Sequence, residues 1–292
     1  MKPNLFIVGA PKCGTTSLYH ALRQNPDILM SKDKEPHFFC NDLKISKYKS
    51  IKEYERLFNF STNKRKKIIG EASATYLFSK VAIKNIKKYN PDAKIIVCIR
   101  NPIEFVYSFH NQMIRAGQEN ITKFETAWDL QQERKKGHNI PRSCKIPILL
   151  QYKKWGLFSE QLARLYKNFP SAQIKLVLLD DFKENKNLIN DIEKFLDVRE
   201  THNYVTPHSN KSYDVKSIFF LQILSFFSDV VTSLKNILHL NINFGIHSYL
   251  FKKNLIKKQK SIKICDKIKN EFLIEISKIE KIIKTDLSAW KI

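Results

Sequence analysis

The sequence predicts an α/β fold in three layers, with a central parallel sheet flanked by helices and a helical region appended at the C-terminus. Short apolar runs alternate along the chain with segments of helical periodicity, and this alternation favours a parallel sheet covered on both faces. The first apolar run ends at a glycine-containing loop that leads into a helix. The 292 residues are 43% hydrophobic and 12% aromatic, which is enough for a sizeable core in one domain.

The expected strands are four apolar runs. Residues 5–8 are wholly apolar and end at Gly9, as a buried parallel strand does. Residues 67–70 and 173–179 are further candidates, and residues 94–99 are the strongest. These runs supply the predicted sheet.

Helices are expected between the strands. Apolar residues recur at helical spacing within residues 15–24, and the sequence Asn-Pro-Asp at 25–27 then ends that helix. Pro102 suits the first turn of a helix that continues to about residue 115. Residues 160–168 are amphipathic and precede the last strand.

The character of the chain changes near residue 206. An aromatic-rich stretch is followed by lysine-rich helical sequence that ends at Trp290. We expect residues 206–292 to pack as an appended region on a body formed by residues 1–205, within one domain. The most apolar stretch, residues 218–234, is interrupted by polar side chains and predicts a buried or interfacial helix, not a membrane span.

The formal net charge is +23, from 51 Lys and Arg against 28 Asp and Glu. Such an excess attracts nucleic acid, anionic lipid, acidic polysaccharide or a highly phosphorylated cofactor. A solvated surface with scattered lysines explains the bulk charge equally well. Local clusters of charge are therefore more informative than the total.

The cysteines predict reduced thiols in a cytosol. They are odd in number and widely spaced, and no two form a Cys-x-x-Cys pair, so neither a disulfide framework nor a zinc site is expected. The N-terminus lacks the features of a signal peptide. We therefore expect a cytoplasmic location, and peripheral contact with the inner face of an anionic membrane remains open.

Residues 9–16, with the sequence GAPKCGTT, form the loop between the first strand and the first helix. Such a loop directs backbone N–H groups and the positive end of the helix dipole at one point, which makes an anion site. Three hydroxyls add donors: Thr15, Thr16 and Ser17.

This loop departs from the triphosphate-binding pattern G-x-x-x-x-G-K-[ST]. Gly9 and Gly14 occupy the two glycine positions and Thr16 the hydroxyl position, but Thr15 stands where the lysine belongs. The nearest lysine is Lys12. The sequence thus predicts a P-loop-like phosphate cradle without the arrangement for magnesium and a triphosphate.

A second anion-binding element follows the strand at residues 94–99. Arg100 stands at the end of this strand, Pro102 follows, and Ser108 lies two helical turns further on. An arginine presents a planar fork of donors to a phosphate, and a serine at that spacing can reach the same group.

The loop sequence PKCGTTSL and the Arg-x-Pro…Ser element together resemble the sulfotransferase family, which uses 3′-phosphoadenosine 5′-phosphosulfate and needs no metal. The resemblance implies that Arg100 and Ser108 hold the 3′-phosphate of this donor. Lys211 is the candidate for a basic loop that closes over the same phosphate. The residues implied to bind the 5′-phosphosulfate are Pro11, Lys12, Cys13, Gly14, Thr15, Thr16 and Ser17.

Residues 32–39, KDKEPHFF, resemble the K-E-x-H-F-F segment of the heparan-type branch of that family. In that branch the glutamate is the catalytic base, which implies this role for Glu35. His37 is the second candidate, because an imidazole is better poised near neutral pH. Lys12 is expected to stabilise the leaving phosphate. The alternative for Glu35 is an exposed acid that only pairs with Lys34.

The acceptor is less well defined. Residues 70–76, GEASATY, resemble the acceptor-cleft segment E-K-T-P-x-Y, but Ala72 and Ala74 replace its lysine and proline, which weakens a heparan-like acceptor. The segment 213–251 has no readable chemistry. Resemblance to bacterial members continues through residues 155–162. The sequence favours sulfation of a hydroxyl or amine on a carbohydrate or glycolipid.

Two other functions remain as alternatives. One is a kinase-like P-loop nucleotide-binding protein, against which Thr15 and the Arg100/Ser108 pair argue. The other is a non-enzymatic basic binder of anionic polymers or membrane, with salt-sensitive binding. No specific nucleic-acid partner is expected, because no recognised nucleic-acid-binding motif accompanies the charge.

Overall fold

The computed structural model describes residues 1–59, 66–185, 187–201, 204, 213–215, 255–257 and 265–291. The chain forms two compact units, treated separately below. The first comprises Met1–Phe105, Leu157–Ser209 and Asn270–Ile292, and the second comprises Val106–Gly156 and Asn210–Lys269. The helix expected at 218–234 and the candidate Lys211 lie outside the described residues, and the boundary expected near residue 205 stays a prediction.

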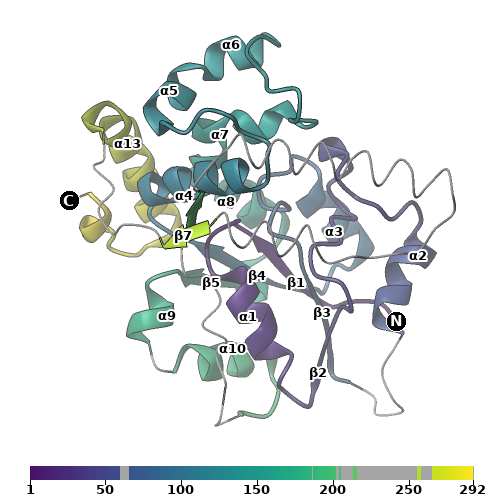
Figure 1. Ribbon diagram of the computed structural model, residues 1–292. Helices are drawn as coiled ribbons and strands as arrows, with labels where there is room; N and C mark the ends of the chain where they lie inside the picture. The colour runs from purple at the N-terminus through teal and green to yellow at the C-terminus, as the bar shows by residue number, and fades with distance from the viewer. Residues whose placement is uncertain are drawn as a thin grey trace, which may run out of the picture. The chain divides into compact units, whose positions relative to one another are not determined.

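The first unit contains a sheet of five parallel strands in the order β2-β3-β1-β4-β5 (Figure 1). The four predicted strands are confirmed. The structure adds β2, whose three residues are too few to show a periodicity in the sequence. The strands are β1 (Leu5–Gly9), β2 (Ile28–Met30), β3 (Ile68–Ala72), β4 (Lys94–Ile99) and β5 (Ile174–Leu178).

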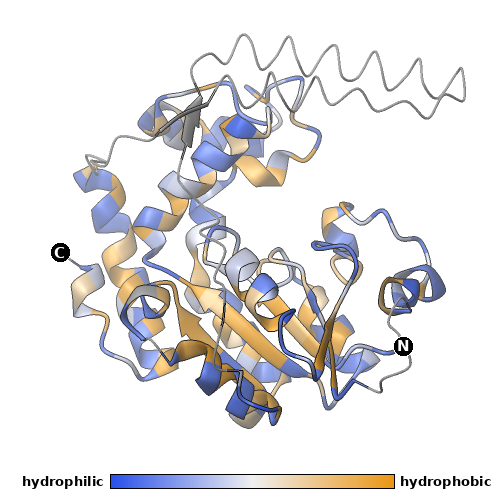
Figure 2. Cartoon of the chain, turned by 60° about the horizontal axis from the view of Figure 1, so that its bottom comes forward, coloured by the Kyte–Doolittle hydropathy of each residue, from blue (hydrophilic) through white to orange (hydrophobic). Residues whose placement is uncertain are grey.

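The sheet is apolar because both of its faces are covered. All five residues of β1 are buried, and so are all residues of β4 except Lys94. Figure 2 shows these strands in hydrophobic colours between helices of mixed character. Continuous apolar runs of this kind are typical of parallel strands with helices on both sides.

The helices of the first unit lie on both faces of the sheet. Helix α1 contacts β1, β2 and β3, and α3 packs against α8; Figure 1 shows α1 and α3 on opposite sides of the strands. The predicted helices at 15–24 and 160–168 are confirmed. The helices are α1 (Thr15–Leu22), α2 (Ile51–Glu55), α3 (Ala82–Tyr89), α8 (Phe158–Asn168), α9 (Asp181–Glu184) and α10 (Leu188–Leu196), with 3₁₀ turns η1 (Asn41–Leu43), η2 (Arg56–Phe58), η4 (Ser171–Gln173) and η5 (Ser288–Trp290).

Two longer helices, α4 (Pro102–Arg115) and α13 (Asp266–Ile283), contribute residues to both units, and α4 confirms the helix predicted after Pro102. Among the helices the structure describes, none is long and apolar enough to cross a membrane. The second unit also contains α5 (Phe124–Asp129), α6 (Gln131–Lys135), η3 (Pro147–Leu150), α7 (Tyr152–Gly156) and the antiparallel pair β6 (Tyr213–Val215) and β7 (Leu255–Lys257).

A buried ion pair lies in the second unit. The guanidinium of Arg134 donates to both carboxylate oxygens of Glu119, at 2.6 and 2.8 Å, and neither side chain is exposed. The hydroxyl of Tyr152 donates to the same carboxylate at 2.7 Å. Burial raises the pKa of Glu119, but the hydrogen bonds from Arg134 and Tyr152 outweigh it, so the net pKa is lowered.

Candidate active site

The anion-binding loop connects the end of β1 to the start of α1. Its backbone departs from ordinary geometry at Gly9, Lys12 and Gly14, whose φ angles are 153°, 61° and 87°. Gly14 is the N-cap residue of α1, and no side chain of the described residues caps this helix. The first-turn N–H groups of α1 therefore lie at a helix terminus suited to an anion.

Both glycines of the loop permit close packing. A Cβ on Gly9 would lie 2.8 Å from the carbonyl oxygen of Ala74 and 2.8 Å from the Cβ of Leu77. A Cβ on Gly14 would lie 2.8 Å from the ring of Phe182. A side chain at either position would displace a neighbour, which explains the two glycines.

The side chains of the loop differ in exposure. Pro11, Cys13 and Thr15 are buried, whereas Lys12, Thr16 and Ser17 are partly exposed. Burial raises the pKa of the Cys13 thiol to about 12, and the charges of Arg100 and Lys12 oppose this rise. Cys13 is thus a protonated structural thiol. The positive charge of Arg100 is felt at this residue of the loop.

Arg100 directly follows β4, as predicted. Its guanidinium pairs with Glu104, four residues later on α4. Its Nε is buried and has no hydrogen-bond partner among the described residues. A buried guanidinium N–H without a partner is costly and suits an anionic ligand.

The turn after Arg100 is held by the end of the chain. The side-chain amide of Asn101 donates to the carbonyl oxygen of Trp290 at 3.0 Å, and the indole of Trp290 donates to Asp180 at 3.2 Å. Ser108 is half-buried on α4. Its predicted action with Arg100 on one phosphate stays a prediction.

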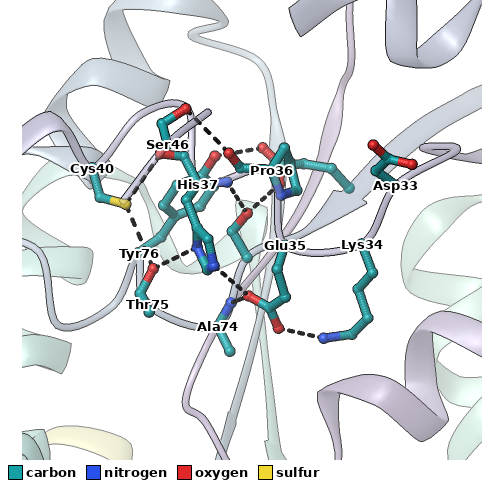
Figure 3. A network of polar contacts seen from close by, with 12 residues as sticks. Asp33, Lys34, Glu35, Pro36, His37, Cys40, Ser46, Ala74, Thr75 and Tyr76 are labelled. Carbon is teal, nitrogen blue, oxygen red and sulfur yellow. Dashed lines mark hydrogen bonds and ion pairs between the residues drawn. The ribbon is translucent and has the colours of Figure 1, made fainter. Parts of the chain in front are cut away.

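Glu35 is held by the last residue of β3 and by the segment that follows it. Its backbone N–H donates to the carbonyl oxygen of Ala72 at 2.9 Å, and its Oε2 accepts the N–H of Ala74 at 2.8 Å. Its Oε1 pairs with Lys34, as Figure 3 shows. The Glu35 side chain is 31% exposed, so the carboxylate is anchored on one side and accessible on the other.

His37 lies beside Glu35. Its Nε2 is 3.6 Å from Oε2 of Glu35, and its Nδ1 is 2.9 Å from the hydroxyl of Thr75 (Figure 3). Its backbone N–H donates to the hydroxyl of Ser73 at 3.0 Å. Burial lowers the pKa of His37 although Glu35 opposes this, so the imidazole is neutral at neutral pH.

A fully buried carboxyl, Glu71, lies beneath these residues. Its Oε1 accepts the hydroxyls of Tyr54 and Tyr76, each at 2.8 Å, and its Oε2 accepts the hydroxyl of Ser73 at 2.7 Å. Burial raises the pKa of Glu71 to about 7, and the three hydrogen bonds oppose the rise. Ser73 therefore links this carboxyl to the backbone of His37.

The raised pKa of Glu71 predicts a pH-dependent stability. The folded protein holds the proton of Glu71 more tightly than the unfolded chain does, so this contribution is full below pH 4.5 and is lost as the pH rises through about 7. The loss amounts to about 3 kcal/mol in the free energy of unfolding. The glutamine of Glu71→Gln has no titratable proton, so this variant should not show the pH-dependent loss of stability. Denaturant unfolding of both proteins from pH 4 to 8 checks this, and a constant difference between them would contradict it.

The fold places these elements at one edge of the sheet. The strands are parallel, so the segments after β1, β2, β3 and β4 all begin at the same edge, where ligands of open α/β sheets bind. This edge brings together the phosphate loop, Glu35 with His37, and Arg100. The sequence did not single out Ser73 and Thr75; their only signal was the segment 70–76.

Known proteins share this arrangement of sequence and fold. A family model described as a sulfotransferase domain matches residues 2–217. Carbohydrate sulfotransferase 15 of Mus musculus is 26% identical over 249 residues, covering 67% of this chain and 44% of the relative. The bifunctional heparan sulfate N-deacetylase/N-sulfotransferase 1 of Xenopus laevis is 28% identical over 237 residues, covering 76% of this chain and 25% of the relative. The chain thus spans less than half the length of these two relatives.

A solved structure extends the comparison. The sulfotransferase from Alicyclobacillus acidocaldarius is 28% identical and superposes with a TM-score of 0.61. The match covers 83% of this chain and 98% of that one. The likeness therefore extends over nearly the whole of a solved bacterial protein.

Proposed function

The chain belongs to the sulfotransferase domain family, and on this premise we propose that it transfers a sulfuryl group from 3′-phosphoadenosine 5′-phosphosulfate to a hydroxyl or amine of a carbohydrate or glycolipid. The proposal rests above all on one residue, Ala74. Its carbonyl oxygen packs against Gly9 of the anion-binding loop, and its N–H holds the carboxylate of Glu35. Ala74 therefore contacts both the anion-binding loop and the proposed catalytic base.

The residues of the loop fit a phosphosulfate. The N–H groups at the start of α1 and the hydroxyls of Thr15, Thr16 and Ser17 would hold its oxygens. The donor supplies the activated sulfuryl group. As the acceptor oxygen or nitrogen bonds to sulfur, the bond from sulfur to the phosphate oxygen breaks, and Glu35 takes the acceptor proton. Lys12 stabilises the charge that grows on the leaving phosphate.

The 3′-phosphate of the donor would bind at Arg100. The Nε of Arg100 is buried without a hydrogen-bond partner among the described residues, and its NH2 pairs with the exposed carboxylate of Glu104. A phosphate would accept a hydrogen bond from the Nε–H of Arg100. It would also compete with the carboxylate of Glu104 for the guanidinium. For Ser108 and for Lys211, which lies outside the described residues, contact with this phosphate is proposed only from the resemblance of the sequence.

Arg100→Ala is expected to weaken binding of adenosine 3′,5′-bisphosphate by roughly 10- to 100-fold, the effect of losing charge-assisted hydrogen bonds. Glu104→Gln is the matched variant, because it removes the partner of Arg100 and leaves the guanidinium in place. It should bind this nucleotide as tightly as the parent protein or more tightly. Calorimetric titration measures both. Equal affinities in the parent and Arg100→Ala would remove Arg100 from the site.

The acceptor is proposed from the names of the relatives, which include carbohydrate and heparan sulfate enzymes. Ala72 and Ala74 supply no charged contact in the segment after β3, which favours an acceptor other than heparan. Transfer of labelled sulfate to a panel of glycans, glycolipids and phenols tests the proposal, with Lys12→Ala and Arg100→Ala as controls. If no acceptor is labelled and adenosine 3′,5′-bisphosphate does not raise the melting temperature, the proposal fails.

A reducing compartment is part of the proposal. The odd number and wide spacing of the cysteines in the sequence are its basis. A cytoplasmic location is proposed on that basis, with peripheral membrane contact as a further proposal. Fractionation of cells that express the tagged protein tests both.

A further inference from the structure

Thr75 occupies a position that the sulfuryl-transfer chemistry does not by itself explain. Its hydroxyl lies 2.9 Å from Nδ1 of His37, and the opposite ring nitrogen, Nε2, faces Oε2 of Glu35 at 3.6 Å (Figure 3). We propose that Thr75 is a positioning residue: its hydroxyl donates to Nδ1 of His37, which fixes the Nε2–H tautomer and leaves Glu35, not His37, as the base. The inference rests on the proposed function.

The carboxylate of Glu35 and the hydroxyl of Thr75 favour the same tautomer of His37. A neutral imidazole carries one N–H, and an ionised carboxylate can only accept hydrogen bonds. If the proton were on Nδ1, the lone pair of Nε2 would face the carboxylate of Glu35, which is repulsive. With the proton on Nε2, the N–H points at Glu35 and Nδ1 accepts from Thr75.

The hydrogen of the Thr75 hydroxyl is available for this bond. The thiol of Cys40 lies 3.5 Å from the same hydroxyl and donates to the carbonyl oxygen of His37 at 3.2 Å. Burial raises the pKa of Cys40 to about 12, so the thiol keeps its proton. With the S–H directed at the carbonyl, the sulfur could only accept from the Thr75 hydroxyl, and it is a weak acceptor at 3.5 Å. The nearer imidazole Nδ1, at 2.9 Å, is the stronger acceptor for this hydrogen.

The surrounding charges also keep His37 neutral. Burial lowers its pKa, the carboxylate of Glu35 opposes this, and the ammonium groups of Lys34 and Lys47 reinforce it. Among the residues that the structure describes, the Cys40 thiol also lies close, and its raised pKa keeps it uncharged. His37 therefore presents its Nε2–H toward Oε2 of Glu35, at 3.6 Å.

The consequence for Glu35 is a defined place for the acceptor proton. A carboxylate offers about four acceptor sites. The N–H of Ala74 donates to Oε2 of Glu35, and the Nε2–H of His37 points toward the same oxygen. The ammonium group of Lys34 pairs with Oε1 and occupies one of its two acceptor sites. No further partner of Oε1 is seen among the described residues, so its second site would take the proton of the acceptor.

Nitrogen-15 NMR of the histidine-labelled full chain tests the tautomer directly, with His37→Gln to assign the signals. In the parent protein His37 should carry its proton on Nε2. Thr75→Val keeps the branched shape and removes the hydroxyl; it should populate the Nδ1–H tautomer and raise the pKa of His37. Its kcat should fall about tenfold, with the KM for the donor unchanged.

Thr75→Ser should restore both the tautomer and kcat, and Thr126→Val, at an exposed threonine of α5, should change neither. An Nδ1–H tautomer in the parent protein would overturn the proposal, and so would a Thr75→Val protein with the parental tautomer and kcat. The NMR measurement needs no turnover. An Nε2–H tautomer in a protein that transfers no sulfate would therefore refute the proposed function and leave the role of Thr75 toward His37 supported.

Discussion

Glu35→Gln is expected to lower kcat by about a thousandfold, within the range of effects found when a general base is removed. Glutamine can still occupy the position beside Ala74, but its amide cannot take the proton of the acceptor. Affinity for adenosine 3′,5′-bisphosphate should not change, because the backbone contacts that hold Glu35 come from Ala72 and Ala74, which are not among the proposed nucleotide contacts. Steady-state rates and calorimetric titration of the same preparation separate the two effects.

Glu160→Gln is the matched control, since it makes the same chemical change at an exposed position on α8. It should retain parental kcat. Full activity in Glu35→Gln would transfer the role of base to His37 or to another group. A parallel loss of nucleotide affinity would instead assign Glu35 to donor binding.

Gly9→Ala is expected to lower the free energy of unfolding by about 3 kcal/mol, from overpacking together with an unfavourable φ. The new Cβ would lie 2.8 Å from the carbonyl oxygen of Ala74, a backbone atom that cannot turn aside. For a chain of this size the melting temperature should fall by roughly 5 °C. Because Ala74 also holds Glu35, sulfate transfer should be lost even at temperatures where the variant is folded.

Gly137→Ala is the control for backbone strain. Gly137 also has a positive φ, 92°, but a Cβ there would meet nothing within 4 Å. This variant should lose about 1 kcal/mol from the φ angle alone and keep full activity. The two variants could instead have the same melting temperature and both transfer sulfate. In that case the contact between Gly9 and Ala74 would not be important for holding Glu35.

Much of the fold could be predicted because its signals are local. The buried strands are continuous apolar runs, and the turn into α4 is marked by Pro102. The strand β2 could not be predicted, since its residues Ile28–Met30 follow an Asn-Pro-Asp turn and are too few to show a period. Without β2 the position of the segment that contains Glu35 beside the segment after β3 could not be derived.

The candidate site was predicted in part for the same reason. The phosphate loop and Arg100 are defined by short motifs next to strands, and the structure places both at the expected strand ends. The supporting residues Ser73 and Thr75 have no such motif. Their roles depend on what lies opposite them, which a linear pattern does not contain.

The amino-acid sequence by itself determined four of the five strands, the glycines of the loop and the candidates Glu35 and His37, because each depends on neighbours along the chain. Only the tertiary structure decided how these candidates are used. Parallel pairing of β2 with β3 brings Ala74 to Glu35 and Thr75 to His37 across 39 and 38 positions of sequence. These contacts orient the carboxylate and the imidazole, because the segments that follow neighbouring parallel strands meet at one edge of the sheet.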